Sequence, residues 1–268
     1  MKLNLIKNNL SNFKKISVLI ITLNEEVHMK ALLSDLDFAD EVVVIDSFST
    51  DNTKAISKSF LNVRFIEHKF ENYTAQRNFA IEQAEGEWIL FLDADERLTP
   101  ELKQEIIATI DKNSDCNAYL FYRKFMFKSK ALHFSGWQTD KIFRLFRKER
   151  ARYTLKRLVH EKLDVEGKIG FFENKLIHYS YSDFQSYKGK MVAYGKLKAQ
   201  EKYLIGFKPT LIHKYGHPIY NFLYQYLVRL GILDGRKGIV ICYLNALSIK
   251  ARYKELDKIN KKSLTIAH

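Results

Sequence analysis

Three carboxylates stand together where a short apolar run of the chain ends. The segment GEWILFLDADERL, residues 86–98, has five apolar residues and then Asp93, Asp95 and Glu96. Two aspartates one residue apart point the same way from an extended backbone, so they could share a divalent cation with a phosphate-bearing ligand. The pattern therefore indicates a site for a nucleotide diphosphate, although a solvated turn can carry the same Asp-x-Asp letters.

Two further apolar runs, residues 16–21 and 41–45, also end in polar side chains. Each run has the length of a buried strand in a parallel sheet. Open α/β sheets bind ligands at the carboxyl ends of their strands, so polar residues at several strand ends favour a binding site. The candidates that follow these two runs are Thr22, Asn24, Glu25, Asp46, Ser47 and Asp51.

Helix capping is the alternative role for these polar residues. Thr22 or Asn24 would cap a helix predicted over residues 25–36, and the residues after the second run would cap the next helix. Both roles can hold together for the first group. In the second group we favour ligand contact for Asp46 and capping for Ser49.

Four parts of the chain resemble the family-2 glycosyltransferases with the GT-A fold. They are ISVLIITLNEE (16–26), EVVVIDSFSTDNT (41–53), YTAQRNFAIEQAEGEWILFLDADERL (73–98), and RLF with VHE (144–146 and 159–161). The resemblance covers nearly the whole length and is strongest from 16 to about 100. Within the family the chain looks like bacterial enzymes of the lipopolysaccharide core, β-1,4-glucosyltransferases among them. It implies an α/β fold, a mostly parallel twisted sheet flanked by helices, with a helical C-terminal extension.

The resemblance also assigns residues to a nucleotide-sugar donor. Asp93 would contact the ribose or the donor sugar, and Asp95 would hold Mg²⁺ or Mn²⁺ against both phosphates. Gln76 and Arg77 lie just ahead of a helix predicted over residues 78–84, and the family places this arginine by the nucleotide. A guanidinium suits a diphosphate because its planar fork bonds two oxygens at once.

The second half of the chain supplies the candidates for the base and the acceptor site. An inverting transfer needs a base that takes the proton of the acceptor hydroxyl, and the family uses a carboxylate. We rank Glu161 ahead of Asp140; His160 would orient Glu161 or complete the metal shell, unless the two are an ordinary surface pair. Trp137 and Arg144 are assigned to the acceptor or donor sugar, although a core position explains Trp137 almost as well.

Composition indicates one catalytic domain over residues 1–183 with an appended part over residues 184–268. The chain has 268 residues, 46% hydrophobic, with three prolines and no Gly/Ser-rich linker. Cys116 and Cys242 stand in no metal or redox spacing, which favours reduced thiols in a cytosolic setting. No apolar segment reaches the length that spans a bilayer, and the first run lacks a cleavage site. We therefore expect a cytoplasmic protein.

The formal charge of +13 is a feature that the fold does not require. Lysines and arginines are dense after Lys188, where helices are predicted from Pro218 to Leu230 and from about Gly238 to Lys254. A basic, aromatic-rich helical tail suits the surface of an anionic membrane, although the aromatics would equally pack on the catalytic domain. The aromatic residues are Tyr187, Tyr194, Tyr203, Phe207, Tyr215, Tyr220, Phe222, Tyr224 and Tyr226.

These expectations compete with two other classes of protein. A nucleic-acid-binding protein would explain the basic tail, but acids at the strand ends would repel phosphates unless a metal intervened. A nucleotidyltransferase would show a glycine-rich phosphate loop near the amino terminus, and none is present around Thr22. The sequence therefore predicts an inverting, metal-dependent transferase that uses a UDP-sugar, UDP-glucose first. The expected partners are a lipid-linked saccharide acceptor and the inner face of the inner membrane, with no nucleic acid.

Overall fold

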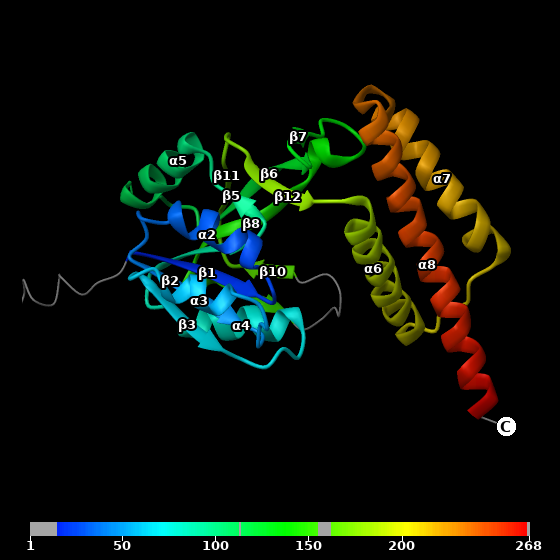
Figure 1. The fold of residues 1–268 in the computed structure, drawn as a ribbon, viewed down its shortest axis with the longest axis horizontal. Helices are drawn as coiled ribbons and strands as arrows, with labels where there is room; N and C mark the ends of the chain where they lie inside the picture. Colours follow the sequence, from blue (N-terminus) through cyan, green and yellow to red (C-terminus); the bar gives the residue numbers. More distant parts are fainter. Residues whose placement is uncertain (1–14, 113, 155–161, 267–268) are drawn as a thin grey trace, which may run out of the picture. The chain divides into compact units, whose positions relative to one another are not determined.

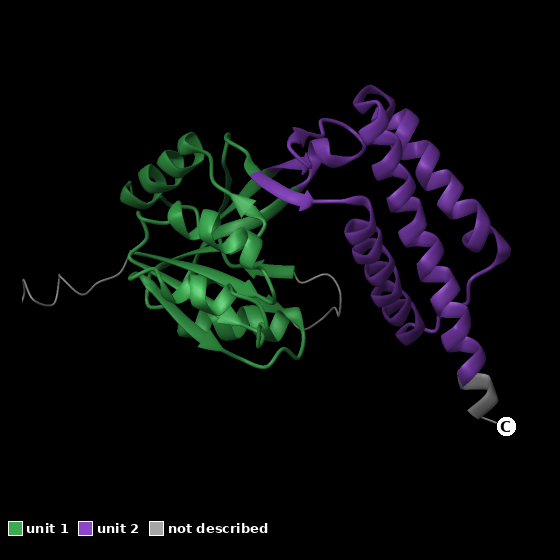
Figure 2. Cartoon of the chain, in the orientation of Figure 1, with its two compact units in different colours: residues 1–122, 141–156, 161–176 green, residues 123–140, 157–160, 177–268 purple. Residues whose placement is uncertain are grey.

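The computed structural model describes residues 15–112, 114–154 and 162–266. It forms two compact units, which Figure 2 shows in different colours. Unit 1 comprises residues 1–122, 141–156 and 161–176, and unit 2 comprises residues 123–140, 157–160 and 177–268. The predicted boundary after residue 183 differs from this division, since residues 123–140 and 177–183 belong with the C-terminal helices.

Unit 1 alternates strands and helices along its first hundred residues, as its sequence pattern predicts (Figure 1). Its elements in chain order are β1 (Ile16–Thr22), α2 (Glu26–Ser34), β2 (Glu41–Asp46), α3 (Thr53–Lys58), β3 (Val63–Glu67), α4 (Tyr73–Gln83), β4 (Trp88–Asp93), β5 (Glu96–Arg97), α5 (Pro100–Asp111), the first half of β6 (Ala118–Phe127), β8 (Lys141–Arg147), η2 (Lys148–Arg150), β9 (Ala151–Thr154), β10 (Lys162–Val165) and β11 (Ile169–Phe171).

The sheet of unit 1 runs in the order β3-β2-β1-β4-β8-β6. Its first four strands are parallel, whereas β8 is antiparallel to both β4 and β6. In this register Thr22 of β1 lies opposite Asp46 of β2, and Ile21 lies opposite Asp93 of β4. The three strand ends that the sequence marked with polar residues therefore lie side by side at one edge.

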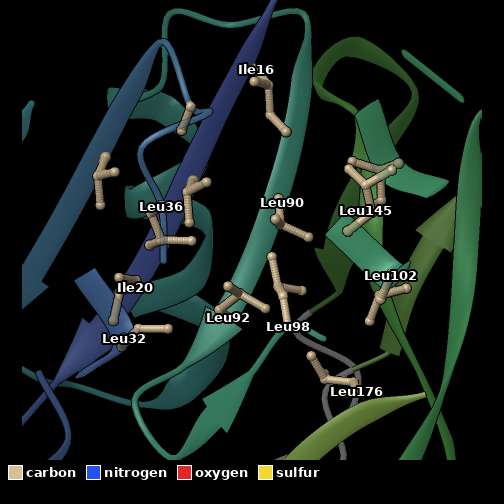
Figure 3. Packing of buried hydrophobic residues seen from close by; sticks show 14 of the residues in the cluster. Ile16, Ile20, Leu32, Leu36, Leu90, Leu92, Leu98, Leu102, Leu145 and Leu176 are labelled. Atoms are coloured by element: carbon tan, nitrogen blue, oxygen red, sulfur yellow. The ribbon is translucent and has the colours of Figure 1, made fainter. Parts of the chain in front are cut away.

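Two hydrophobic clusters cover the two faces of this sheet. Because successive side chains of a strand point to opposite faces, Val18 and Ile20 of β1 join one cluster and Leu19 joins the other. The first cluster is completed by α2 and α5, through residues such as Leu32 and Leu102 (Figure 3). The second is completed by α4 and the β9–β10 hairpin. The sheet is thus held rigidly between two layers, and its loop-bearing edge stays open.

Helix boundaries differ from the prediction at two positions that matter for the site. Gln76 and Arg77 lie inside α4, not ahead of it, because Asn72 caps the helix by accepting a hydrogen bond from the Ala75 amide at 2.9 Å. The helix after β1 begins at Glu26, and its N-cap residue Glu25 makes no side-chain capping bond. Thr22 and Asn24 are therefore not its caps.

Unit 2 is a helical assembly with a short strand region. Its elements are the second half of β6, β7 (Lys130–Ala131), η1 (Trp137–Thr139), β12 (Leu176–Tyr181), of which residues 177–181 belong here, α6 (Phe184–Leu204), η3 (Ile212–Gly216), α7 (His217–Leu223), η4 (Tyr224–Val228), η5 (Gly231–Asp234) and α8 (Arg236–Ile266). The long helix α8 lies between α6 and α7 and packs against both (Figure 1). Two predicted helices are confirmed in outline, although the first begins before Pro218 and the second continues to Ile266.

A buried carboxylate joins residues 123–140 to the C-terminal helices. Asp234 accepts hydrogen bonds from the amides of His133 at 3.0 Å and Phe134 at 2.8 Å. Trp137 stacks on Phe125 with ring centroids 4.2 Å apart and packs against the cluster that α6 and α8 complete. Residues 123–140 are thus an integral part of unit 2. Because the contacts that hold them there are long-range, composition alone predicted a different boundary. Among the described residues, no helix has the length and apolar character needed to cross a membrane.

Candidate functional site

A buried aspartate ties the ends of β1 and β2 together. The Asp46 carboxylate accepts hydrogen bonds from Thr22 Oγ1 at 2.8 Å, from the Ser49 amide at 2.7 Å and from Ser49 Oγ at 2.5 Å. Ser49 therefore anchors the loop to Asp46 and is not the cap of α3, whose N-cap position is Asn52. Ligand contact by Asp46 stays a prediction, because its side chain is buried against these partners.

The loops that follow these strands are cross-linked by their own polar groups. Asn24, which has a positive φ of 57°, accepts a hydrogen bond from the Thr50 amide at 2.8 Å. Asp51 accepts from the amides of Glu26 and Thr53, both at 3.0 Å, and so serves the first turns of α2 and α3. Burial acts to raise the pKa of the Asp51 carboxyl, but hydrogen bonds from Thr53 and Glu26 hold that pKa below its ordinary value. Asp51 thus stabilises the loop framework.

A cavity of about 270 Å³ opens beside these loops. Four residues predicted to bind the nucleotide sugar meet in its wall, together with two exposed aromatic rings, Phe70 and Tyr73, that were not predicted to belong to the site. The lining comprises Ile21, Thr22, Leu23, Glu25, Ser47, Phe70, Tyr73 and Gln76. A lining that combines polar groups with aromatic rings suits a flat ligand with hydrogen-bonding edges.

The wall of this cavity is held in place by hydrogen bonds. Gln76 Nε2 donates to Ser47 Oγ at 3.2 Å, and its Oε1 lies 2.8 Å from His68 Nδ1. The His68 ring in turn stacks on Phe79 with centroids 3.7 Å apart. Phe70 and Tyr73 meet edge to face with centroids 5.0 Å apart. These contacts hold the wall of the cavity in place.

At the end of β4, Asp93 lies between two arginines. Arg77 Nη2 donates to Asp93 Oδ1 at 3.0 Å, and Arg144 Nη2 donates to Asp93 Oδ2. The same Arg144 nitrogen donates to Glu96 Oε1 at 2.7 Å, and Glu96 Oε2 accepts from the Asp93 amide at 3.1 Å. Arg77 also lies 4.6 Å from the ring centroid of Phe91. Two cations and two anions thus form a nearly neutral cluster.

Arg144 is fully buried in this cluster. Burial acts to lower the pKa of its guanidinium, but the carboxylates of Asp93 and Glu96 raise that pKa above its ordinary value against the opposing charge of Arg77. The guanidinium therefore stays charged and fixes the Asp93 carboxylate. Its burial does not support the predicted direct contact with a sugar, and we assign Arg144 to positioning Asp93.

The predicted pairing of Asp93 with Asp95 is corrected by the backbone. Ala94 and Asp95 form a turn between β4 and β5, so the alternation of an extended strand does not apply to them. Asp93 is engaged by arginines, whereas Asp95 lies half-buried in the turn. Within the described ranges no group of three His, Cys, Asp or Glu side chains could enclose a metal ion. A single carboxylate still fits Mg²⁺, which usually keeps several waters and binds substrate phosphates.

Comparison with known proteins places this geometry in a family. A family model described as Glycosyl transferase family 2 matches residues 17–166, which contain the three strand ends, the cavity and the Asp93 cluster. The chain belongs to glycosyl transferase family 2. As a family-2 glycosyltransferase it is an enzyme, and neither the nucleotidyltransferase nor the nucleic-acid-binding alternative is retained.

Relatives of this glycosyltransferase span nearly its whole length. It is 28% identical over 250 residues to the lipopolysaccharide core biosynthesis glycosyltransferase LpsC of Rhizobium meliloti, covering 89% of this chain and 93% of LpsC. It is 30% identical to the uncharacterized glycosyltransferase RT0209 of Rickettsia typhi, covering 94% and 88% of the two chains. Among solved structures, the mannosyltransferase PcManGT of Pyrobaculum calidifontis, in complex with GDP-Man and Mn²⁺, aligns with TM-score 0.56 at 14% identity over 91% and 87% of the chains. The fold is GT-A, as the sequence predicted.

Of the remaining predicted residues of the glycosyltransferase, two belong to unit 2 and two lie outside the described residues. Asp140 belongs to unit 2, where its carboxylate accepts a hydrogen bond from Arg123 Nε at 2.6 Å. Trp137 is also in unit 2 and packs in the aromatic cluster, which favours the core position. His160 and Glu161 lie outside the described residues, so the base and the histidine ligand stay predictions.

Three residues of the site were given no role by sequence reasoning. Glu96 was seen only as one acid of a cluster, yet it holds both Arg144 and the Asp93 amide. Phe70 and Tyr73 line the cavity. The signal for Tyr73 was its place at the start of the YTAQRN segment, whereas nothing around Phe70 distinguished it from other loop aromatics.

Proposed function

We propose that this glycosyltransferase moves a hexose, with inversion, from a UDP-linked donor onto a saccharide of the lipopolysaccharide inner core or another lipid-linked acceptor. UDP-glucose is the first candidate donor. The observation that carries the proposal is the cavity lined by Thr22, Glu25, Ser47 and Gln76, at the same sheet edge as the Asp93 cluster. Similarity to LpsC, a lipopolysaccharide core biosynthesis glycosyltransferase, supports the acceptor.

The cavity suits the nucleoside end of the donor. Its volume of about 270 Å³ is close to the lower limit of ligand pockets, about 300 Å³, and fits a base and ribose better than a whole sugar nucleotide. Phe70 and Tyr73 offer aromatic faces to the base, and Gln76 and Ser47 offer hydrogen bonds to its edge. The diphosphate then extends toward Asp93 and Asp95, along the edge where their strand ends.

We assign different roles to Asp93 and Asp95. Asp93, fixed by Arg77 and Arg144, would accept a hydrogen bond from a hydroxyl of the ribose or donor sugar. Asp95 would hold Mg²⁺ or Mn²⁺, which when bound stabilises the charge of the departing nucleoside diphosphate. Glu161 stays our proposed base for the acceptor hydroxyl. A lipid-linked acceptor also implies work at the cytoplasmic face of the inner membrane.

A panel of sugar nucleotides tests the donor. The purified protein is incubated with UDP-glucose, UDP-galactose, UDP-GlcNAc or GDP-mannose and Mg²⁺ or Mn²⁺, with and without EDTA. We expect release of UDP from UDP-glucose that EDTA abolishes, and a rise in Tm with UDP, because a ligand that binds only the folded state stabilises it. Release from GDP-mannose alone would overturn the UDP assignment, and undiminished release in EDTA would overturn the metal.

A further inference from the structure

The helical segment 211–228 of unit 2 carries its apolar residues on the outside. Leu211, Tyr215, Ile219, Leu223 and Leu227 recur every four residues, and all five are exposed. A second row of exposed apolar residues, at 212, 220, 224 and 228, runs beside them. We call these two rows the outer stripe; its nine side chains are between 38% and 78% exposed.

The backbone of this segment keeps the outer stripe straight. The π-helical turns η3 (Ile212–Gly216) and η4 (Tyr224–Val228) enclose the α-helical α7. A π turn holds more residues than the 3.6 residues of an α turn. A segment that combines π and α turns therefore has about four residues per turn on average. Residues four apart therefore lie above one another along the segment, and the apolar rows do not wind around to the packed face.

The opposite face of the segment, which packs on α8, carries polar groups beside the buried Pro218. Lys214 Nζ pairs with Asp257 Oδ2 at 2.6 Å, and His217 Nδ1 lies 2.9 Å from the Tyr253 hydroxyl. The usual amphipathic helix of a water-soluble protein does the reverse and turns its apolar face to the core. An apolar stripe of this length facing water is unusual for a monomer and indicates an interaction surface.

A cationic hollow adjoins the outer stripe. A cavity of about 580 Å³ is lined by Lys202, His213 and His217 together with Phe207 and Tyr253, and it shares Ile212 and Tyr220 with the stripe. Burial lowers the pKa of His217, and the nearby charges of Arg252, His213 and Lys202 lower it further. The lowered pKa favours the neutral imidazole of His217, so Lys202, with Arg252 nearby, supplies the positive charge of the hollow and would stabilise an anion placed there.

The charge of the surrounding unit decides between the possible partners. Residues 184–268 carry 16 Lys and Arg against 4 Asp and Glu, so nearly all of the chain's excess positive charge lies there. A second copy of the chain would bring the same positive charge against itself. An anionic bilayer offers an apolar phase beneath a layer of negative phosphates, which matches the outer stripe and the hollow together.

We propose that the outer stripe and the adjoining cationic hollow form a docking surface for the acidic phospholipids of a bilayer. The stripe lies in the plane of the interface, with Tyr215, Tyr220 and Tyr224 at the level of the headgroups, where tyrosine is enriched in membrane proteins. The hollow takes a lipid phosphate. This surface brings the enzyme to a lipid-linked acceptor, and its evidence is independent of the donor.

Vesicle co-sedimentation tests the proposal with the full chain. The vesicles are pure phosphatidylcholine or phosphatidylcholine mixed with phosphatidylglycerol, and the stripe variant is Ile219→Asp combined with Leu227→Asp. Leu61→Asp is the matched control, because Leu61 is a fully exposed leucine of unit 1. We expect the wild type and the control to bind the mixed vesicles at least tenfold more tightly than pure phosphatidylcholine. The stripe variant should bind the mixed vesicles at least tenfold more weakly than the wild type.

Two further readouts separate the alternatives. The rise in Tm with UDP should be the same in all three proteins, which shows that the stripe variant is folded and that its donor site is intact. Light scattering without vesicles reports the oligomeric state. A wild-type dimer that the stripe variant converts to a monomer, with no vesicle binding by either, would overturn the proposal in favour of a second copy. Equal binding by the stripe variant and wild type would overturn the assigned surface.

Discussion

The buried guanidinium of Arg144 donates a hydrogen bond to the Asp93 carboxylate at the end of β4. Arg144 lies on β8, the antiparallel neighbour of β4, and also bonds Glu96 at 2.7 Å. Arg144 thus holds one oxygen of the Asp93 carboxylate and Arg77 holds the other, while Asp93 itself is only partly covered. The arrangement is that of a positioning residue behind a ligand-binding acid.

Replacing Arg144 by methionine should impair both stability and transfer. Removing one partner of a buried ion pair leaves its carboxylates uncompensated and costs about 3–5 kcal/mol of the free energy of unfolding. The variant Arg152→Met is the control, because its pair with Glu82 is exposed and is worth about 1 kcal/mol or less. Urea unfolding and kcat/KM measure both effects. Arg144→Lys should recover more stability than kcat/KM, since an ammonium cannot bridge two carboxylates in the same way; parallel recovery of both would reduce Arg144 to a structural role.

Asp93 and Asp95 should respond differently to alanine although they are two residues apart. Asp93→Ala removes the partner of two arginines, so we expect a loss of about 3 kcal/mol in the free energy of unfolding. Asp95→Ala should abolish metal-dependent UDP release, because it removes the carboxylate assigned to the metal. Normal turnover by Asp95→Ala would remove the metal assignment, and an unchanged free energy of unfolding in Asp93→Ala would contradict the role of Asp93 as partner of two arginines.

The parts of this site that the sequence predicts are those encoded by local runs. The sequence predicts the buried strands that end at Thr22, Asp46 and Asp93, because the apolar length of a central strand and its abrupt end are both features of a short stretch of sequence. The sequence does not predict the turn at Ala94 and Asp95, because the same residues are compatible with an extended strand. Arg144 stands 51 positions beyond Asp93, and only the pairing of β8 with β4 brings them together.

The division of the chain was hidden for a similar reason. Asp234 holds the amides of His133 and Phe134 about 100 positions earlier, and no composition shift marks such a contact. The outer stripe is a different case, because its four-residue repeat is visible in the sequence. The sequence does not show whether the stripe faces solvent, because an apolar stripe of that period is equally expected to face a core. Only the exposure of Ile219 and its neighbours in the structure shows that it faces outward.

The aromatic wall of the cavity should contribute to nucleotide affinity. Tyr73→Ala removes an exposed ring that offers a face to the base, and loss of a stacking contact worth about 1–3 kcal/mol raises the Kd for UDP roughly tenfold. Leu61→Ala truncates a fully exposed side chain that does not line the cavity and should leave the Kd unchanged. Isothermal titration with UDP and Mn²⁺ measures both; an unchanged Kd in Tyr73→Ala would place the base elsewhere.

The contribution of Asp51 to stability should depend on pH. Its pKa in the folded state lies below the ordinary value of 3.8, so the ionised carboxylate stabilises the fold fully above pH 3.8 and loses that effect as the pH falls through the folded pKa. Asp51→Asn should cost about 1 kcal/mol at pH 7, as for other groups that serve helix amides. Urea unfolding from pH 7 to pH 3 should show this difference shrinking below pH 3.8. A difference that persists unchanged at pH 3 would show that charge is not involved.

Two glycines of α6 should respond in opposite directions to alanine. A Cβ on Gly195 would lie 2.3 Å from the Ser248 carbonyl oxygen of α8, so the two helices would have to separate. A Cβ on Gly189, one and a half turns earlier on the same helix, meets no atom within 4 Å. Gly189→Ala should therefore raise the free energy of unfolding by about 0.5–1 kcal/mol through helix propensity alone, whereas Gly195→Ala should lower it. Thermal unfolding followed by circular dichroism measures both, and a gain in stability for Gly195→Ala would mean that α6 and α8 are not packed this closely.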